Sequence, residues 1–303
     1  MRGAPALILS YHRVAHREAD PHALCVRPER FAAQLDELSR IARIVPLALV
    51  TRPSRRPQVA LTFDDGYRDN LTTAYPLLNS ASAPATFFIT TGMLDRRQEF
   101  WWDRLERLLI AEEVPAVRLE LELGGHRLWF DARTPADRER AHHALHHRLL
   151  GFDNATIARV LDQLAERFGS RPEPRQENLP LTSGELRLLA AADGVEIGAH
   201  SVTHPRLADL TPGRQRAEIA TSKQTLEACV DAPVRSFAYP FGGPDAVDDV
   251  APRLVAAEGL DWACTTLEGR VTSDSDPFRL PRCTVRDWDG PEFGRRVQRW
   301  LGL

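Results

Sequence analysis

Short apolar runs alternate with helical patterns along most of the chain, and this alternation is the feature that most restricts the fold. The runs are rich in β-branched and aromatic residues, which indicates buried strands. We expect strands at residues 6–11, 42–45, 59–63, 85–91, 195–199, 234–239, 262–267 and 282–285. About seven to eight strands separated by helices predict an α/β protein with a distorted parallel (β/α) barrel; a doubly wound open sheet is the competing fold.

Residues 94–179 interrupt the alternation and predict an insertion into a barrel that comprises residues 1–93 and 180–303. A helix begins near Phe100-Trp101-Trp102, and we expect these rings to pack internally rather than to bind sugar. Residues 117–130, which surround Gly124-Gly125, are typical of a hairpin, and residues 134–150 and 154–168 predict two helices. We interpret the mixed insertion as a lid or a partner surface.

The composition argues against several classes of protein. A net charge of −3 without a long basic run argues against nucleic-acid binding. No stretch approaches the roughly 18 consecutive apolar residues of a membrane span, and the first apolar run is too short for a signal peptide, so we expect a soluble, cytoplasmic protein. The four cysteines lie far apart and are expected to be free thiols. The oligomeric state is left open.

Polar residues lie at the carboxyl ends of the expected strands. His12 follows the first strand, Asp64 and Asp65 follow residues 59–63, and His200 follows residues 195–199. These strand ends share one mouth in a parallel barrel, where barrel enzymes keep their chemistry. Two carboxylates at the end of a buried strand are unfavourable without a partner, and a divalent metal is the usual partner. A solvated Asp-Asp-Gly turn is the alternative.

His200 and His204 lie four residues apart, so a turn or tight loop can direct both imidazoles to one metal. A histidine pair in a surface loop is the alternative. One carboxylate and two imidazoles suit zinc best, with cobalt, nickel, manganese and iron as alternatives. The same spacing recurs within the insertion, on a charged helix that we interpret as a solvated face, at His142/His146 and His143/His147.

The segments 62–67, Thr-Phe-Asp-Asp-Gly-Tyr, and 200–204, His-Ser-Val-Thr-His, resemble two motifs of the polysaccharide deacetylases, carbohydrate esterase family four. Those motifs read T-F-D-D-G and H-[ST]-x-x-H, and the resemblance covers about residues 5–93 and 180–303. It implies a metal-dependent hydrolase that removes N-acetyl groups from an amino sugar. By the same resemblance Asp64 is the general base, and Asp65, His200 and His204 are the metal ligands.

Residues 236–243 resemble the third motif of the family, R-x-P-[FY]. The resemblance implies that Phe241 supplies a backbone N–H to the oxyanion, and we place Tyr239 and Tyr67 in the oxyanion and substrate region. The arginine of the motif, which orients the base, is Ala238 in this chain. We expect Arg282 to replace it; a surface or helix-dipole role is the alternative.

The last motif of the family, L-x-H, supplies the general acid, but no histidine follows His204. Some exopolysaccharide deacetylases are similar to circular permutants in which the strand of this motif lies at the N-terminus. The first and last strands of a closed barrel are neighbours, so we expect His12, in Ser10-Tyr11-His12, to be the acid. A histidine that is merely hydrogen-bonded at a strand end is the alternative.

The function implied by this resemblance is N-deacetylation of an amino sugar in a bacterial exopolysaccharide, a cell-envelope glycan or its precursor. Removal of a formyl or another acyl group is one alternative. A carbohydrate-binding barrel that has lost turnover is another, because the third and last motifs both depart from the family pattern. The sequence does not specify the sugar, the linkage, the chain length or the native metal.

Overall fold

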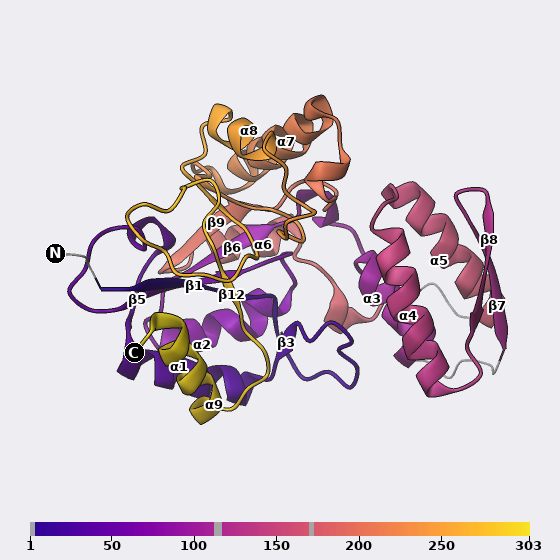
Figure 1. Cartoon of the computed structure of the whole chain (residues 1–303), viewed down its shortest axis with the longest axis horizontal. Coiled ribbons are helices and arrows are strands. Elements are labelled where there is room, and N and C mark those ends of the chain that lie inside the picture. Colours follow the sequence, from indigo (N-terminus) through magenta and orange to yellow (C-terminus); the bar gives the residue numbers. More distant parts are fainter. Residues whose placement is uncertain (1–3, 112–116, 170–172) are drawn as a thin grey trace. The chain divides into compact units, whose positions relative to one another are not determined.

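The computed structural model describes residues 4–111, 117–169 and 173–303. So far as these residues extend, the chain divides into two compact units, and Figure 1 colours both along the sequence. We call the first the barrel unit; it comprises Met1–His16, Ala23–Arg96 and Leu181–Leu303. The second, the insertion unit, comprises Arg17–His22 and Arg97–Pro180.

A sheet of eight strands forms the centre of the barrel unit, and every strand pair within it is parallel. Its order is β11-β10-β9-β6-β5-β1-β12, with β4 beside β5. The strands are β1 (Ala6–Tyr11), β4 (Arg43–Ile44), β5 (Gln58–Phe63), β6 (Ala85–Ile89), β9 (Val195–Ala199), β10 (Ser236–Ala238), β11 (Trp262–Cys264) and β12 (Cys283–Thr284). A short ladder outside this sheet joins β2 (Arg13–Val14) to β3 (Cys25–Val26).

The last strand segment bridges the two edges of the sheet. Cys283 and Thr284 pair with Leu9 and Ser10 of β1. Just before them, Leu280 makes a parallel bridge to Cys264 of β11, and its N–H donates to Ala263 at 2.8 Å. The predicted distorted parallel barrel is therefore confirmed, and its first and last strands are neighbours.

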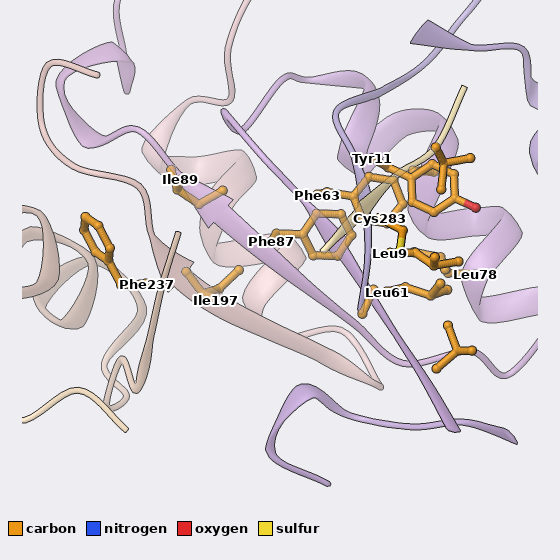
Figure 2. Close-up of a cluster of buried hydrophobic side chains, with 14 of the residues drawn as sticks. Leu9, Tyr11, Leu61, Phe63, Leu78, Phe87, Ile89, Ile197, Phe237 and Cys283 are labelled. Atoms are coloured by element: carbon orange, nitrogen blue, oxygen red, sulfur yellow. The ribbon is translucent and has the colours of Figure 1, made fainter. Parts of the chain in front are cut away.

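Both faces of the sheet are buried, as expected for parallel strands covered by helices. On the outer face, the rings of Tyr11, Phe63 and Phe87 stack in series with centroid separations of 5.3 and 4.9 Å; Figure 2 shows this part of the core. The alternate residues of the same strands, such as Ile8 and Ala60, lie on the inner face and belong to a second apolar cluster inside the barrel. Strand side chains therefore alternate between two cores.

Helices of the barrel unit cover the outer core. They are α1 (Pro28–Ile41), α2 (Tyr75–Ser80), α6 (Ser183–Ala190), α7 (Pro212–Val230), α8 (Ala251–Ala257) and α9 (Gly290–Leu301). Short turns of other helix types are η1 (Leu47–Leu49), η2 (Asn70–Ala74), η3 (Thr91–Met93) and η6 (Leu207–Asp209). The predicted capping box of α6 is present, because Thr182 and Glu185 each accept the other's backbone N–H.

Two local features differ from the sequence prediction. The single helix expected between residues 70 and 79 is the π-helical turn η2 followed by α2, and Pro76 lies at the start of α2, where its missing N–H is tolerated. The C-terminal helix α9 was not predicted. Its buried residues Phe293, Val297 and Leu301 belong to the outer core.

The insertion unit has its own apolar core. Its elements are α3 (Trp101–Glu106), η4 (Arg107–Ala111), β7 (Arg118–Leu123), β8 (His126–Asp131), α4 (Pro135–Leu149), α5 (Asn154–Phe168) and η5 (Gln176–Asn178). The predicted hairpin is present, with Leu123 opposite His126 across a turn whose glycines have φ of +59° and +78°. Phe100 and Trp102 are buried and stack at 4.6 Å, in agreement with the expected internal packing.

The interpretation of the second histidine cluster as a solvated face is wrong for half of its members. His142 is fully buried and His146 is half-buried, whereas His143 and His147 are exposed. The ring of His22 lies 5.2 Å from that of His142 and 4.2 Å from that of His146. Burial, followed by repulsion from neighbouring imidazoles, lowers the pKa of both His142 and His146 to about 3.

Buried ion pairs tie distant segments of the insertion unit together. Arg17 donates to Asp103 at 3.1 Å and to Glu106 at 2.9 Å, while Arg175 donates to Glu99 and Glu106 at 2.7 and 2.6 Å. These contacts explain why residues 17–22 group with the insertion, because unpaired charges in such a setting are strongly unfavourable. None of the described helices is long and apolar enough to cross a membrane.

Candidate active site

The residues predicted for the site meet at the carboxyl ends of the barrel strands. Asp64 and Asp65 follow β5, His200 follows β9, and His12 follows β1. Asp64, Asp65 and His200 are each at most 3% exposed. Charged side chains at such depth need close partners.

Three side chains converge on one point. Asp65 Oδ1 lies 3.6 Å from His200 Nε2 and 3.3 Å from His204 Nε2, and the two Nε2 atoms are 3.2 Å apart. A tetrahedral ion with ligands at about 2.0–2.1 Å holds those ligands about 3.3–3.4 Å from one another. The three atoms therefore fit one divalent cation, and no other such group occurs among the described residues.

The ionisation states of these groups also suit a cation. His200 Nδ1 is 2.7 Å from the carbonyl oxygen of Ala238, which can only accept, so Nδ1 carries the hydrogen and Nε2 presents its lone pair. Burial lowers the pKa of His204, against the opposing effect of Asp65. Burial raises the pKa of Asp65, but the adjacent imidazoles of His200 and His204 outweigh it and leave the pKa well below its usual range.

Backbone strain is concentrated at the same place. Asp65, Ser201, His204 and Phe241 have φ between +59° and +74°, a region that residues other than glycine rarely adopt. They account for four of the eight non-glycine residues with positive φ in the described parts of the chain. Such outliers persist where the surroundings hold them and are often found at functional sites.

Arg282 binds Asp64 with both ends of its guanidinium. Its Nη1 and Nη2 each donate to one carboxylate oxygen at 2.7 Å, and Nη1 also lies 3.1 Å from Thr62 Oγ1. Its Nε donates to the carbonyl of Thr265 at 2.9 Å, so the fully buried guanidinium is held on several sides. Burial raises the pKa of Asp64, Arg282 lowers it, and the net pKa is below its usual value. Asp64 is therefore an ionised, oriented carboxylate.

His12 lies beside Asp64, with Nε2 4.0 Å from Asp64 Oδ2. Asn70 Nδ2 donates to the His12 carbonyl at 2.9 Å, and Asp69 accepts hydrogen bonds from the two residues that follow His12, at Arg13 Nε and Val14 N. Burial lowers the pKa of His12, and the carboxylates of Asp65 and Asp64 oppose this shift by favouring the imidazolium.

Phe241 lies against the metal-binding side chains. Its ring meets the ring of His204 edge-on at 4.7 Å, and its carbonyl accepts from Thr266 Oγ1 at 2.8 Å. Within the described parts of the chain, no group accepts a hydrogen bond from the Phe241 N–H, which is therefore available to a ligand. Gly242 follows with φ of +56°, and a Cβ there would lie 2.7 Å from the Thr266 nitrogen.

The structure does not support substrate contact by the side chains of Tyr239 and Tyr67. Tyr239 is fully buried, packs on Phe237 and donates its hydroxyl to the Phe278 carbonyl at 2.9 Å. Tyr67 is 1% exposed, and the guanidinium of Arg13 lies 4.2 Å above its ring. Both tyrosines therefore support neighbouring segments from within the core.

Several residues of the site were not predicted. The Thr62 hydroxyl contacts Arg282, and the Ala238 carbonyl fixes the tautomer of His200, although the side chain of the family arginine is absent there. Asp69 and Asn70 hold the segment that carries His12. Their position directly after the Asp-Asp-Gly motif was an available signal, whereas a backbone carbonyl leaves none in the sequence.

A search for related proteins agrees with this geometry. The profile of a family described as polysaccharide deacetylase matches residues 51–116 and 176–259, which include both aspartates and both histidines of the motifs but not His12 or Arg282. YxkH of Bacillus subtilis (strain 168), which is named after the same family, is 25% identical over 119 residues, or 39% of this chain. That match spans 41% of the relative's own length.

Solved structures share the fold over the whole chain. The deacetylase PplD of Streptococcus pyogenes, solved with acetate, superimposes with a TM-score of 0.62 at 19% identity over 99% of each chain. IcaB from Ammonifex degensii has a TM-score of 0.61 at 17% identity and covers 100% of this chain and 99% of its own. At such identities the likeness establishes the architecture.

Proposed function

Because the chain belongs to the polysaccharide deacetylase family, we propose that it is a metal-dependent hydrolase that removes N-acetyl groups from an amino sugar. The substrate would be a bacterial exopolysaccharide, a cell-envelope glycan or a precursor of one. One observation carries this proposal. The three-ligand cation site includes Asp65, and the adjacent residue Asp64 has a buried carboxylate that is hydrogen-bonded at both oxygens by Arg282.

Asp65, His200 and His204 would hold the cation, and their nitrogen and oxygen donors favour zinc, with cobalt, nickel, manganese and iron as alternatives. When bound, such an ion polarises a carbonyl and lowers the pKa of bound water to about 7. With three protein ligands, a tetrahedral ion keeps a position for water or substrate.

The remaining residues divide the proton transfers of amide hydrolysis. Asp64, ionised and fixed by Arg282, takes a proton from the attacking water while the water oxygen bonds to the acetyl carbonyl carbon. The Phe241 N–H stabilises the negative charge that develops on the carbonyl oxygen. His12, in the imidazolium form that the carboxylates of Asp65 and Asp64 favour, would give a proton to the amine nitrogen as the carbon–nitrogen bond breaks, so the products are acetate and a free sugar amine.

The structure bears on the alternative of a binding protein without turnover. That alternative arose because the family arginine is replaced by Ala238 and the usual acid is missing. Arg282, directly before β12, donates to Asp64, and His12, directly after β1, lies 4.0 Å from it. These contacts support the proposal that Arg282 and His12 take over the roles of the two missing motif residues.

The decisive experiment measures acetate release from oligomers of N-acetylglucosamine by the zinc- or cobalt-loaded protein. Asp64→Asn should lower kcat by about 10²–10⁴-fold while the protein still binds metal. A parallel assay for formate release from N-formylglucosamine separates deacetylation from deformylation. A wild-type protein that binds the oligomer but releases neither acid with any of these metals would contradict the proposal and favour the binding module.

A further inference from the structure

The segment from His200 to His204, here called the ligand loop, carries two of the three metal-binding side chains in an unfavourable backbone conformation. Ser201 and His204 have φ of +62° and +59°, where side chains other than glycine are rarely found. The loop follows β9 and is not part of a helix or strand. Something outside it must therefore maintain the geometry that brings both Nε2 atoms to one point.

One side of the ligand loop is held by backbone contacts. The N–H groups of Thr91 and Gly92, in η3 after β6, donate to the carbonyls of Ser201 and Val202 at 3.1 and 2.8 Å. Within the loop, the His204 N–H donates to Ser201 Oγ at 3.0 Å. These bonds engage the carbonyls of Ser201 and Val202, whereas the N–H groups of Val202 and Thr203 point to another partner.

That partner is Glu218 of α7. One oxygen of its carboxylate accepts from the N–H groups of Val202 and Thr203 at 2.8 and 2.9 Å, and the other accepts from Thr203 Oγ1 at 2.7 Å. An ionised carboxylate is the side chain best suited to this set, because all three partners are donors and charge-assisted bonds are stronger than neutral ones. All three bonds reach residues other than the two histidines.

We propose that Glu218 is a positioning residue for the cation site, which acts by holding the ligand loop in the geometry that bound metal requires. The proposal rests on the metal-dependent function proposed above. It differs from a general stabilising role, because the three bonds end on Val202 and Thr203, two of the three residues between the ligands. Outer residues that orient ligands typically change metal affinity about 10–100-fold when they are replaced.

The test compares Glu218→Gln with Glu227→Gln in the full-length protein. Glu227 lies on the same helix and also accepts a backbone N–H, from Val234 at 3.1 Å, a residue outside the ligand loop. The readouts are the Co²⁺ dissociation constant, the visible spectrum of bound Co²⁺ and the thermal unfolding of the metal-free protein. None of them depends on deacetylase turnover.

We expect Glu218→Gln to weaken Co²⁺ binding about 10–100-fold and to alter its spectrum, and Glu227→Gln to do neither. Glu218→Asp, which keeps the carboxylate, should recover part of the affinity. If Glu218→Gln does not fold, Thr203→Val removes a single donor and should weaken binding by a smaller factor in the same direction.

Two outcomes separate this proposal from the function on which it rests. Wild-type affinity and spectrum in Glu218→Gln, with binding intact in the wild type, would overturn the role of Glu218 and leave the metal-dependent function standing. Failure of the wild-type protein to bind any divalent transition metal would overturn both.

Discussion

Replacing Arg282 by methionine is the most direct test of how the buried carboxylate of Asp64 is maintained. The substitution removes both 2.7 Å bonds to Asp64 and leaves that carboxylate, 2% exposed, without its counter-charge. Breaking one half of a buried ion pair costs about 3–5 kcal/mol. At about 2–4 °C per kcal/mol for a domain of this size, the unfolding midpoint should fall by about 6–20 °C.

The same substitution changes the pH dependence of activity and stability. In the wild type the pKa of Asp64 is below its usual value, so its contribution to stability is present above the unfolded pKa and is lost as pH falls through the folded one. Without Arg282, burial is the dominant effect and raises the pKa of Asp64. The acid limb of kcat/KM should therefore move to higher pH.

Thermal unfolding and acetate release across a pH series measure both effects. Asp64→Asn combined with Arg282→Met removes both charges, so this double variant should unfold at a higher temperature than Arg282→Met alone. Arg279→Met is the matched surface control, because its 2.8 Å partner Asp249 is almost fully exposed and such pairs contribute at most about 1 kcal/mol. An Arg282→Met protein with the wild-type midpoint and an unshifted acid limb would refute the reasoning.

Three further outcomes are expected. Gly242→Ala places a Cβ 2.7 Å from the Thr266 nitrogen at a φ of +56°, so it should cost about 2 kcal/mol in thermal stability and lower kcat for acetate release. His142 and His146 have folded pKa values of about 3, below the unfolded value. The insertion unit should therefore lose up to about 2 kcal/mol of stability per imidazole between pH 7 and pH 5, measured as faster hydrogen exchange confined to that unit. Equal protection from exchange at both pH values would contradict this. Chelation should abolish acetate release, and added zinc should restore it. Asp65→Asn should weaken zinc binding by more than about 100-fold. Activity that survives complete metal removal would exclude the metal-dependent reaction.

The architecture and the cation site could be predicted because their signals are local in the sequence. Each buried strand is a continuous apolar run, and the polar residue that ends it points to the mouth of the barrel. Asp65 and His200 lie within two residues of the end of such a run, and His204 lies four residues after His200. Once the strands are parallel, their shared direction brings these residues together, whatever the details of packing.

Features that depend on contacts between distant segments were predicted poorly. The burial of His142 was missed although this residue shares the buried face of α4 with Leu145 and Leu149. The ring of His22, from a distant segment, packs against it and could not be placed from the sequence. Glu218 lies on a helix whose sequence offers no sign that its carboxylate caps a loop 15 residues earlier. The sequence around Tyr239 also could not show that its side chain points into the core, because the face on which a side chain lies is uncertain where a strand ends or bends.

Closure of the barrel and organisation of the proposed chemistry depend on the same short segments. Leu280 bridges to β11 and Cys283 pairs with β1, and Arg282 lies between them with its guanidinium on Asp64. His12 is the residue directly after β1, the strand that Cys283 joins. A change that loosens the pairing of residues 280–284 would therefore displace both Arg282, the partner of Asp64, and β1, which supports His12. The metal ligands that follow β5 and β9 would keep their places. Loss of turnover with retained metal binding is thus the expected first consequence of opening this edge.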